Sequence, residues 1–175
     1  MARKKSWSRV LGRLLRHRWL DESDTRKAIP PEMLERLATR VAASEKRHSG
    51  EIRIFVEAGL PVSYVLRDAT ARERAAAMFG KLRVWDTEHN NGVLIYLLLA
   101  ERAIEIVADR GLSRRIDAAE WQRIVGQMGS AFKQGRIEQG LTEALDQVSA
   151  LLVAHFPLAP GEPDRNELPD EPVIG

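Results

Sequence analysis

The sequence of 175 residues contains no cysteine. This absence excludes disulfide bonds, thiol nucleophiles, zinc ribbons and iron–sulfur clusters, and it agrees with a reducing compartment. Long hydrophobic runs are also missing: the longest, residues 93–100, has the length of a strand, whereas a membrane-spanning helix needs about 20 apolar residues. Since no uninterrupted apolar stretch follows the basic N-terminal residues, we expect neither a cleavable secretory signal nor a membrane span.

The motifs of the common enzyme classes are missing as well. The sequence has no Walker glycine loop, no dinucleotide-binding fingerprint, no Gly-x-Ser-x-Gly and no His-Glu-x-x-His. The histidines are scattered, and each is expected to be an ordinary surface or helix-end residue: His17, His48, His89 and His155. The sequence therefore assigns no catalytic residue and leaves open whether the protein is an enzyme.

The net charge of +2 is the sum of three unequal parts. Residues 1–20 contain seven basic and no acidic side chains, whereas residues 157–175 contain five acids and one arginine. The stretch between them is nearly neutral. We therefore expect a basic arm over residues 1–28, an α/β domain over residues 29–156 and an extended or disordered acidic, proline-rich tail over residues 157–175.

Apolar residues in the arm recur at intervals of three and four, which predicts an amphipathic helix with arginines around its apolar face. This pattern is typical of a helix that lies at a membrane interface. A frayed, solvated arm and a helix docked on the protein's own domain are the alternatives. The residues expected to contact a partner are Trp7, Arg9, Leu11, Arg13, Leu14, Arg16 and Trp19.

The basic arm would attract any polyanion, including nucleic acid. Its interleaved leucines favour lipid or protein instead. We therefore expect an anionic membrane surface or a membrane protein as the partner, and no specific nucleic acid. The expected location is the cytoplasm, with peripheral attachment to the inner membrane, and the sequence identifies no small-molecule substrate.

Hydrophobic periodicity predicts the order helix, strand, helix, strand, strand, helix, helix within the domain. The expected helices cover residues 30–48, 68–81, 117–133 and 137–155, and the expected strands cover residues 51–57, 93–99 and 103–109. The first strand alternates apolar and charged residues, so one face should be buried and the other solvated. The second is apolar on both faces, as a central strand is. The predicted fold class is α/β, a three- to four-stranded mixed sheet sandwiched between helices.

A candidate site follows from this topology. A tight turn centred on residues 101–102 would make Val93 face Arg110 across the hairpin. The loop 86–92 then meets residues 109–111, where a parallel first strand also begins. Carboxylates and amides around such a loop supply the oxygen ligands that calcium or magnesium prefers. The candidate metal ligands are Asp86, Glu88, Asn91 and Asp109, with Glu51 as a further ligand, and the candidate binding residues are Asn90 and Arg110.

A purely structural role for the same residues is the alternative. Asn91 and Gly92 can form a turn that needs a positive φ. Asp109 can cap neighbouring amides, and Arg110 can pair with an acid. The sequence does not decide between these roles and a calcium or magnesium site.

The segment 91–96 reads Asn-Gly-Val-Leu-Ile-Tyr, and the segment 104–111 reads Ile-Glu-Ile-Val-Ala-Asp-Arg-Gly. Further positions of the same pattern are Gly50–Arg53, Trp121, Phe132, Gly135, Gly140, Leu141 and Asn166–Asp170. With these motifs the chain resembles the TPM-domain family, whose namesakes include a thylakoid-lumen protein of photosystem II repair. The similarity covers roughly residues 30–157 and the tail motif.

The resemblance implies a mixed sheet between helices. It also implies a family in which some members bind calcium and have weak acid-phosphatase activity, while others are accessory or assembly factors of membrane proteins. Many bacterial members are exported and tethered by a terminal transmembrane segment. Because we expect neither a signal nor a span in this sequence, the chain resembles a short soluble bacterial subgroup. One position departs from the pattern: many members have an acid immediately before Asn-Gly, where this chain has Asn90, and an amide adds no charge to a cation site.

Two functions follow as hypotheses. The first is a non-catalytic accessory or binding module, associated through the arm with a membrane surface or a membrane protein. The alternative is a divalent-metal-dependent weak phosphatase of the TPM type at residues 86–91 and 109, where a metal ion would polarise phosphate and activate water.

Overall fold

The computed structural model describes residues 7–19, 22–159, 161 and 166–175. Its centre is one mixed sheet in the order β3-β2-β1-β4. The strands are β1 (Ile52–Glu57), β2 (Val93–Leu98), β3 (Ala103–Ala108) and β4 (Val173–Ile174). β1 and β2 are parallel and β2 and β3 are antiparallel, which confirms the predicted mixed sheet.

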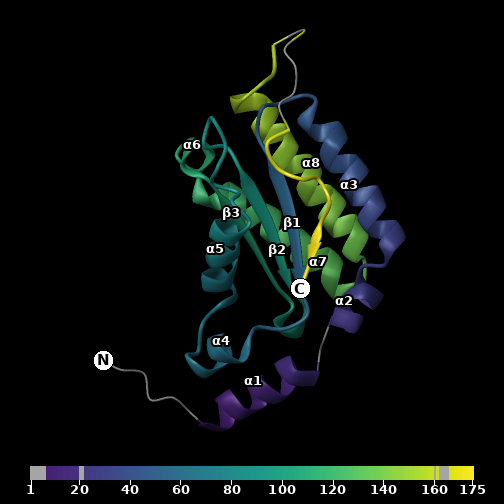
Figure 1. Ribbon diagram of the computed structural model, residues 1–175, viewed down its shortest axis with the longest axis vertical. Helices are drawn as coiled ribbons and strands as arrows, with labels where there is room; N and C mark the ends of the chain where they lie inside the picture. The colour runs from purple at the N-terminus through teal and green to yellow at the C-terminus, as the bar shows by residue number, and fades with distance from the viewer. Residues whose placement is uncertain (1–6, 20–21, 160, 162–165) are drawn as a thin grey trace.

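Helices cover both faces of this sheet (Figure 1). Their bounds are α1 (Trp7–Trp19), α2 (Glu22–Ala28), α3 (Pro31–Glu45), α4 (Val62–Leu66), α5 (Ala71–Lys81), α6 (Arg110–Ser113), α7 (Ala118–Lys133) and α8 (Ile137–His155). One face of the sheet packs against α3, α7 and α8, and the other packs against α4 and α5. The fold is therefore a three-layer α/β/α sandwich, as the sequence predicts.

Side chains alternate between the two cores along each central strand. Ile95 of β2 joins the cluster under α3, α7 and α8, whereas Leu94 and Tyr96 join the cluster under α5. All six residues of β2 are buried. A strand with apolar side chains on both faces needs both faces covered, and β2, at the centre, has helices on each side.

The predicted register of the β2–β3 hairpin is wrong by two residues. Val93 pairs with Ala108, not with Arg110, and Leu98 pairs with Ala103. The reason is the turn, which is a 3-10 helix, η1 (Leu99–Glu101), followed by Arg102 with a φ of 50°. Because side chains alternate with a period of two, the shift leaves every residue on its predicted face.

Two helical segments differ from the prediction. The polar segment before Ile29 is the helix α2, and its Thr25 side chain is fully buried. The helix predicted over 68–81 begins instead after Thr70, whose side chain and Glu73 form a capping box. A capping box satisfies the first free amides of a helix and fixes where it starts.

The first strand was expected to have a solvated face, and this expectation is wrong. All six residues of β1 are buried, and the charged residues Arg53 and Glu57 are only 7% and 5% exposed. Glu57 accepts hydrogen bonds from Arg74 of α5 and, at 2.8 Å, from the Tyr96 hydroxyl. Arg74 therefore neutralises a buried acid.

The tail is extended rather than disordered over residues 166–175. β4 pairs in parallel with β1, with Val173 opposite Phe55 and Ile174 opposite Val56. The amide of Gly175 donates to the Val56 carbonyl and its carbonyl accepts from the Ala58 amide. The tail thereby closes the outer edge of β1, beside α2 (Figure 1).

Gly92 provides a test of the packing at the start of β2. A Cβ at this position would lie 1.9 Å from the Val84 carbonyl oxygen, a backbone atom with no room to move. We expect Gly92→Ala to lower the free energy of unfolding, measured in urea, by about 2 kcal/mol or more.

The matched control is Gly126→Ala in the middle of α7, where an added Cβ meets no heavy atom within 4 Å. This change should raise stability by about 0.5–1 kcal/mol, because alanine loses less backbone entropy in a helix. Equal midpoints for the two variants would contradict the packing described for Gly92.

Candidate functional site

Loop 86–92 and residues 109–111 meet at one end of the sheet, where β1 and β2 begin and β3 ends, as the predicted topology requires. The Gly111 amide donates to the Asn90 carbonyl at 2.8 Å, and Arg110 Nε donates to Asn90 Oδ1 at 2.9 Å. Asn90 has a φ of 52°, so the positive φ expected at Asn91 and Gly92 lies one residue earlier. Asn90 and Arg110 thus connect loop 86–92 to the residues after β3.

Asn91 and Asp109 present two oxygens at this end that lack hydrogen-bond donors. Asn91 is fully buried and its amide nitrogen donates to Ser49, but its Oδ1 has no partner among the described residues. Asp109 Oδ1 accepts from the Arg110 amide at 2.6 Å as the N-cap of α6, while its buried Oδ2 has no partner there either. Buried polar atoms without partners are rare, and amide and carboxylate oxygens are suitable ligands for a hard cation.

The other three predicted ligands make different contacts. Asp86 is half exposed and lies 3.9 Å from Arg83, while the Glu88 backbone amide donates to the Glu167 carboxylate. Both oxygens of Glu51 accept backbone amides of the tail. Within the described ranges, no three histidine or carboxylate side chains are placed to hold one metal ion. The calcium or magnesium site stays a prediction.

Sequence reasoning missed a cluster of buried ionisable side chains next to Glu51. Glu45, at the end of α3, is 2% exposed and accepts the Ile52 amide, and its second oxygen has no hydrogen-bond partner among the described residues. Arg53 is 7% exposed, and two of its nitrogens likewise lack partners there. Desolvation lowers the pKa of Arg53, and the charges of the tail acids Glu171 and Asp170 act against this shift. The tail motif at residues 166–170 was visible in the sequence, but the sequence did not show which buried side chains this motif contacts.

Burial shifts the titration of two groups near this cluster. Burial, with the nearby carboxylates of Glu51 and Asp170, raises the pKa of Glu45 to about 9. Burial also lowers the pKa of His48 to about 4, and its ring bonds Ser44 and the Gly50 carbonyl. At neutral pH, Glu45 therefore carries a proton and His48 is uncharged.

At the opposite end of the sheet, α1 is docked on the domain. Arg13 donates to Glu101, to Asp68 and to the Ala69 carbonyl, each at 2.8 Å. His17 is 7% exposed and lies between Glu101 and the Leu60 amide. Leu14 packs against the core cluster under α5. Arg13 and Leu14 thus contact the protein's own domain, which is the docked alternative considered for the arm.

The outward face of α1 carries the remaining predicted contacts. Leu11, Leu15 and Trp19 are 60%, 52% and 81% exposed and follow one another at intervals of four residues, so they form one stripe. Arg16 is also exposed. The side chains of Trp7 and Arg9 lie outside the described part of the chain. α4 contacts α1 and exposes Val62 and Leu66.

A family model described as the TPM domain matches residues 23–151. The chain belongs to the TPM-domain family. No curated protein matches the chain at a significant level. The matched region begins in α2 and ends in α8, so α1 and the strand β4 lie outside it.

Two solved structures are similar to this TPM domain. The BA42 protein from the psychrophilic bacterium Bizionia argentinensis is 26% identical, with a TM-score of 0.73 over 84% of this chain and 95% of its own. The N-terminal domain of a protein from P. gingivalis is 20% identical, with a TM-score of 0.56 over 72% of this chain and 79% of its own. The second likeness concerns the fold alone.

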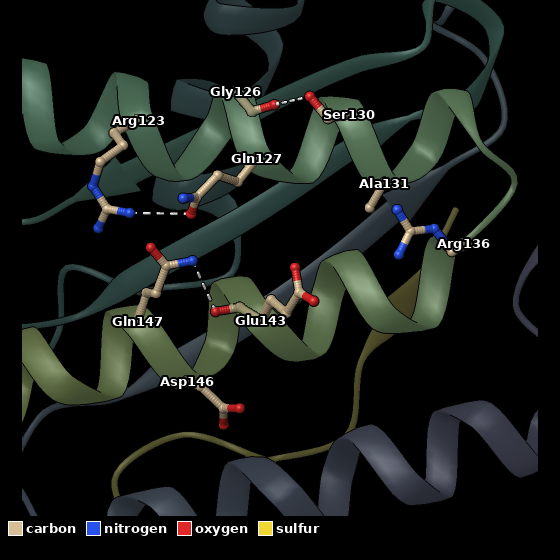
Figure 2. A pocket seen from close by; sticks show the side chains of 9 residues that line it. All are labelled: Arg123, Gly126, Gln127, Ser130, Ala131, Arg136, Glu143, Asp146 and Gln147. Carbon is tan, nitrogen blue, oxygen red and sulfur yellow. Dashed lines mark hydrogen bonds between the residues drawn. The ribbon is translucent and has the colours of Figure 1, made fainter.

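A groove of about 800 Å³ lies between α7 and α8 of the TPM domain (Figure 2). Its polar groups are bonded mainly within their own helices: Arg123 donates to Gln127, Ser130 to the Gly126 carbonyl, and Gln147 to the Glu143 carbonyl. Asp146 points away from α7. The groove therefore offers no converging set of catalytic groups.

None of the helices in the described ranges is long and apolar enough to cross a membrane. The longest is α8, with 19 residues. Several of its apolar residues, including Leu145 and Leu152, are buried in the core under the sheet. The amphipathic pattern of α8 thus serves the interior of the TPM domain.

The raised pKa of Glu45 predicts how stability depends on pH. In the unfolded chain Glu45 loses its proton near its ordinary pKa of 4.5, whereas the folded protein keeps it up to about 9. This group therefore makes the folded state less stable as the pH rises between those values. Glu45→Gln should remove that part of the slope and raise the Tm at pH 8, by about 2–4 °C for each kcal/mol gained.

Thermal unfolding followed by circular dichroism between pH 5 and 9 tests this expectation. Glu35→Gln is the control, because Glu35 lies exposed on the same helix. Curves of Tm against pH that run parallel for the wild type and Glu45→Gln would contradict the assignment.

Proposed function

We propose that the protein is a non-catalytic accessory module that attaches peripherally to an anionic membrane surface through α1. The observation that carries the proposal is the stripe of Leu11, Leu15 and Trp19, which stays exposed while the opposite face of the same helix is docked. Exposed large apolar residues on one contiguous surface are typical of interaction sites. We infer the cytoplasmic face of the inner membrane as the site of attachment.

The chemistry of the stripe favours lipid as its occupant. Tryptophan prefers the boundary between headgroups and acyl chains, and Trp19 is the most exposed of the large apolar residues described. Arg16 and Arg18 are exposed on the same helix, and the first 20 residues contain seven basic side chains. Basic residues near an anionic bilayer contribute about 1 kcal/mol each, so apolar insertion and charge would act together.

Docking of α1 adds a constraint that a free arm would lack. Because Arg13 and His17 hold the helix on the domain, only its outward face is available to lipid. α4, which contacts α1, also exposes two apolar side chains, Val62 and Leu66. Attachment through both helices would give the domain one orientation on the bilayer.

Vesicle co-sedimentation tests the proposal. We expect the wild type to bind vesicles that contain phosphatidylglycerol, and binding should fall at high salt because the surface charge is screened. Trp19→Glu combined with Leu15→Glu should lower the bound fraction at least tenfold, since two carboxylates would have to enter the interface.

Trp85→Glu is the matched control. Trp85 is another exposed tryptophan, 49% accessible, and lies in the segment between α5 and β2. This variant should bind as the wild type does. Failure of the wild type to bind, or equal loss in the Trp19 and Trp85 variants, would contradict the membrane proposal and favour a membrane-protein partner.

A second candidate function is a divalent-metal site of the kind a weak phosphatase needs. The unpartnered oxygens of Asn91 and Asp109 favour it. One carboxylate and one amide, completed by carbonyls or water, make a weak calcium site, with a Kd of about 10⁻⁴ to 10⁻³ M. A bound ion would polarise a phosphate ester.

Calorimetry with calcium tests the site. Asp109→Asn keeps the N-cap acceptor but removes the charge, so it should abolish the binding heat without unfolding the protein. Asp117→Asn, an equal charge change at an exposed N-cap, should leave binding intact. Absence of binding heat in the wild type would rule out this metal site. If the wild type and Asp117→Asn hydrolyse p-nitrophenyl phosphate and Asp109→Asn does not, the site also supports phosphatase activity.

A further inference from the structure

The tail occupies an edge that would otherwise be open. β1 is the outer strand of the β3-β2-β1 unit, and residues 173–175 satisfy its free backbone groups. An exposed strand edge readily pairs with another segment of chain. The tail is thus bound as a peptide ligand would be, by strand addition.

Glu51 holds the tail backbone at a second place. It is 2% exposed, and its two carboxylate oxygens accept the amides of Glu167 at 2.9 Å and of Leu168 at 3.2 Å. A carboxylate that accepts two consecutive amides forms charge-assisted bonds, which are stronger than neutral ones. Glu51 therefore recognises an extended backbone rather than a particular side chain.

Side chains of the tail supply the specificity. Leu168 is 8% exposed and belongs to the core cluster that includes Phe55 and Leu94. Glu167 accepts the Glu88 amide, and the charge of Asp170 lies close enough to Arg53 to affect its titration. The contacts thus select leucine between two acids, in the order acid, leucine, proline, acid.

We propose that the edge of β1, with Glu51, Arg53 and the pocket for Leu168, is a peptide-binding groove that the tail of a second copy of this chain can occupy in place of the groove's own tail. The groove fits the segment Asn166–Gly175, which every copy carries. This exchange would link two TPM domains without altering either core.

The length of the connection allows the exchange. After α8 the chain is held at Arg47 and His48, where the Leu158 amide donates to Arg47 and Pro157 pairs with His48. It is held again at Glu51, only four residues further along the sequence, by the Glu167 amide. Residues 158 and 167 are nine positions apart, and extended chain spans about 3.3 Å per position, or roughly 30 Å in all. That reach suffices for the groove of a neighbouring copy.

At ordinary protein concentrations the tail of the same chain occupies the groove in preference to the tail of another copy. A segment on a short linker has an effective concentration in the millimolar range. The wild type should therefore be monomeric at micromolar concentrations and exchange tails only when crowded or when its own tail is weakened. The experiment must remove this advantage while leaving one intact groove and one intact tail.

Complementation between two full-length variants meets that requirement. Glu51→Gln weakens the groove, because its amide group puts a donor against one of the tail amides, and it leaves the tail intact. Leu168→Asp weakens the tail by placing a charge in an apolar pocket, and it leaves the groove intact. Neither variant alone has both an intact groove and an intact tail, whereas an equimolar mixture contains one of each.

We expect the mixture at 100 µM to contain at least tenfold more dimer than either variant alone, at twice the monomer mass of 19.7 kDa. Light scattering gives the mass, and native mass spectrometry with one variant labelled with nitrogen-15 identifies the heterodimer. Glu35→Gln, the same change at an exposed position, should give no heterodimer with Leu168→Asp.

A labelled peptide of residues 166–175 provides the second measurement. It should bind Leu168→Asp at least tenfold more tightly than the wild type, whose own tail competes. No binding to a Leu168→Asp protein with wild-type circular dichroism would overturn the groove. If that variant fails to fold, Leu168→Ala replaces it in both assays. Peptide binding without heterodimers in the mixture would overturn the second copy as occupant.

Discussion

Residues 51–57, which include β1, bury three charged side chains, and much of the structure follows from the need to stabilise them. Glu51, Arg53 and Glu57 are each less than 8% exposed. A buried charge is costly unless opposite charges or hydrogen-bond donors surround it. Glu57 is met by Arg74 and Tyr96, which binds α5 to the sheet, and Glu51 is met by amides of the tail. The charged side chains of residues 51–57 therefore hold both α5 and the tail against the sheet.

This constraint explains what the sequence could and could not predict. Apolar periodicity located β1, β2, β3, α7 and α8, because it reflects burial within a few neighbouring residues. The same pattern misassigned the face of β1 that carries Arg53 and Glu57, since a charge is normally a sign of solvent. The partners of Glu51 lie 116 and 117 residues away, and nothing local reveals them. Turn geometry was the other weak point: the 3-10 turn lengthened the hairpin connection and moved the register.

The candidate sites lie at opposite ends of the sheet. Asn91 and Asp109 are at the end where β1 begins, and the docked α1 is at the end where β1 leads into α4. Six residues of strand, at about 3.3 Å each, separate the ends by roughly 20 Å. A cation at one end would lie beyond the Debye length at physiological salt from charges at the other. The proposed membrane attachment and the proposed metal site would thus act independently of each other.

The position of the tail relative to α1 links the two proposals. The acid–leucine–proline–acid segment is held at Glu51, at the end of the sheet away from α1, and the chain returns along β1 toward Ala58. A bilayer in contact with Leu11, Leu15 and Trp19 would therefore leave the Glu51 end of the groove facing water. Copies attached to one membrane are also concentrated and oriented, which reduces the entropy lost when two molecules associate. Attachment through α1 would thus favour exchange of tails between neighbouring copies at concentrations where the free protein keeps its own.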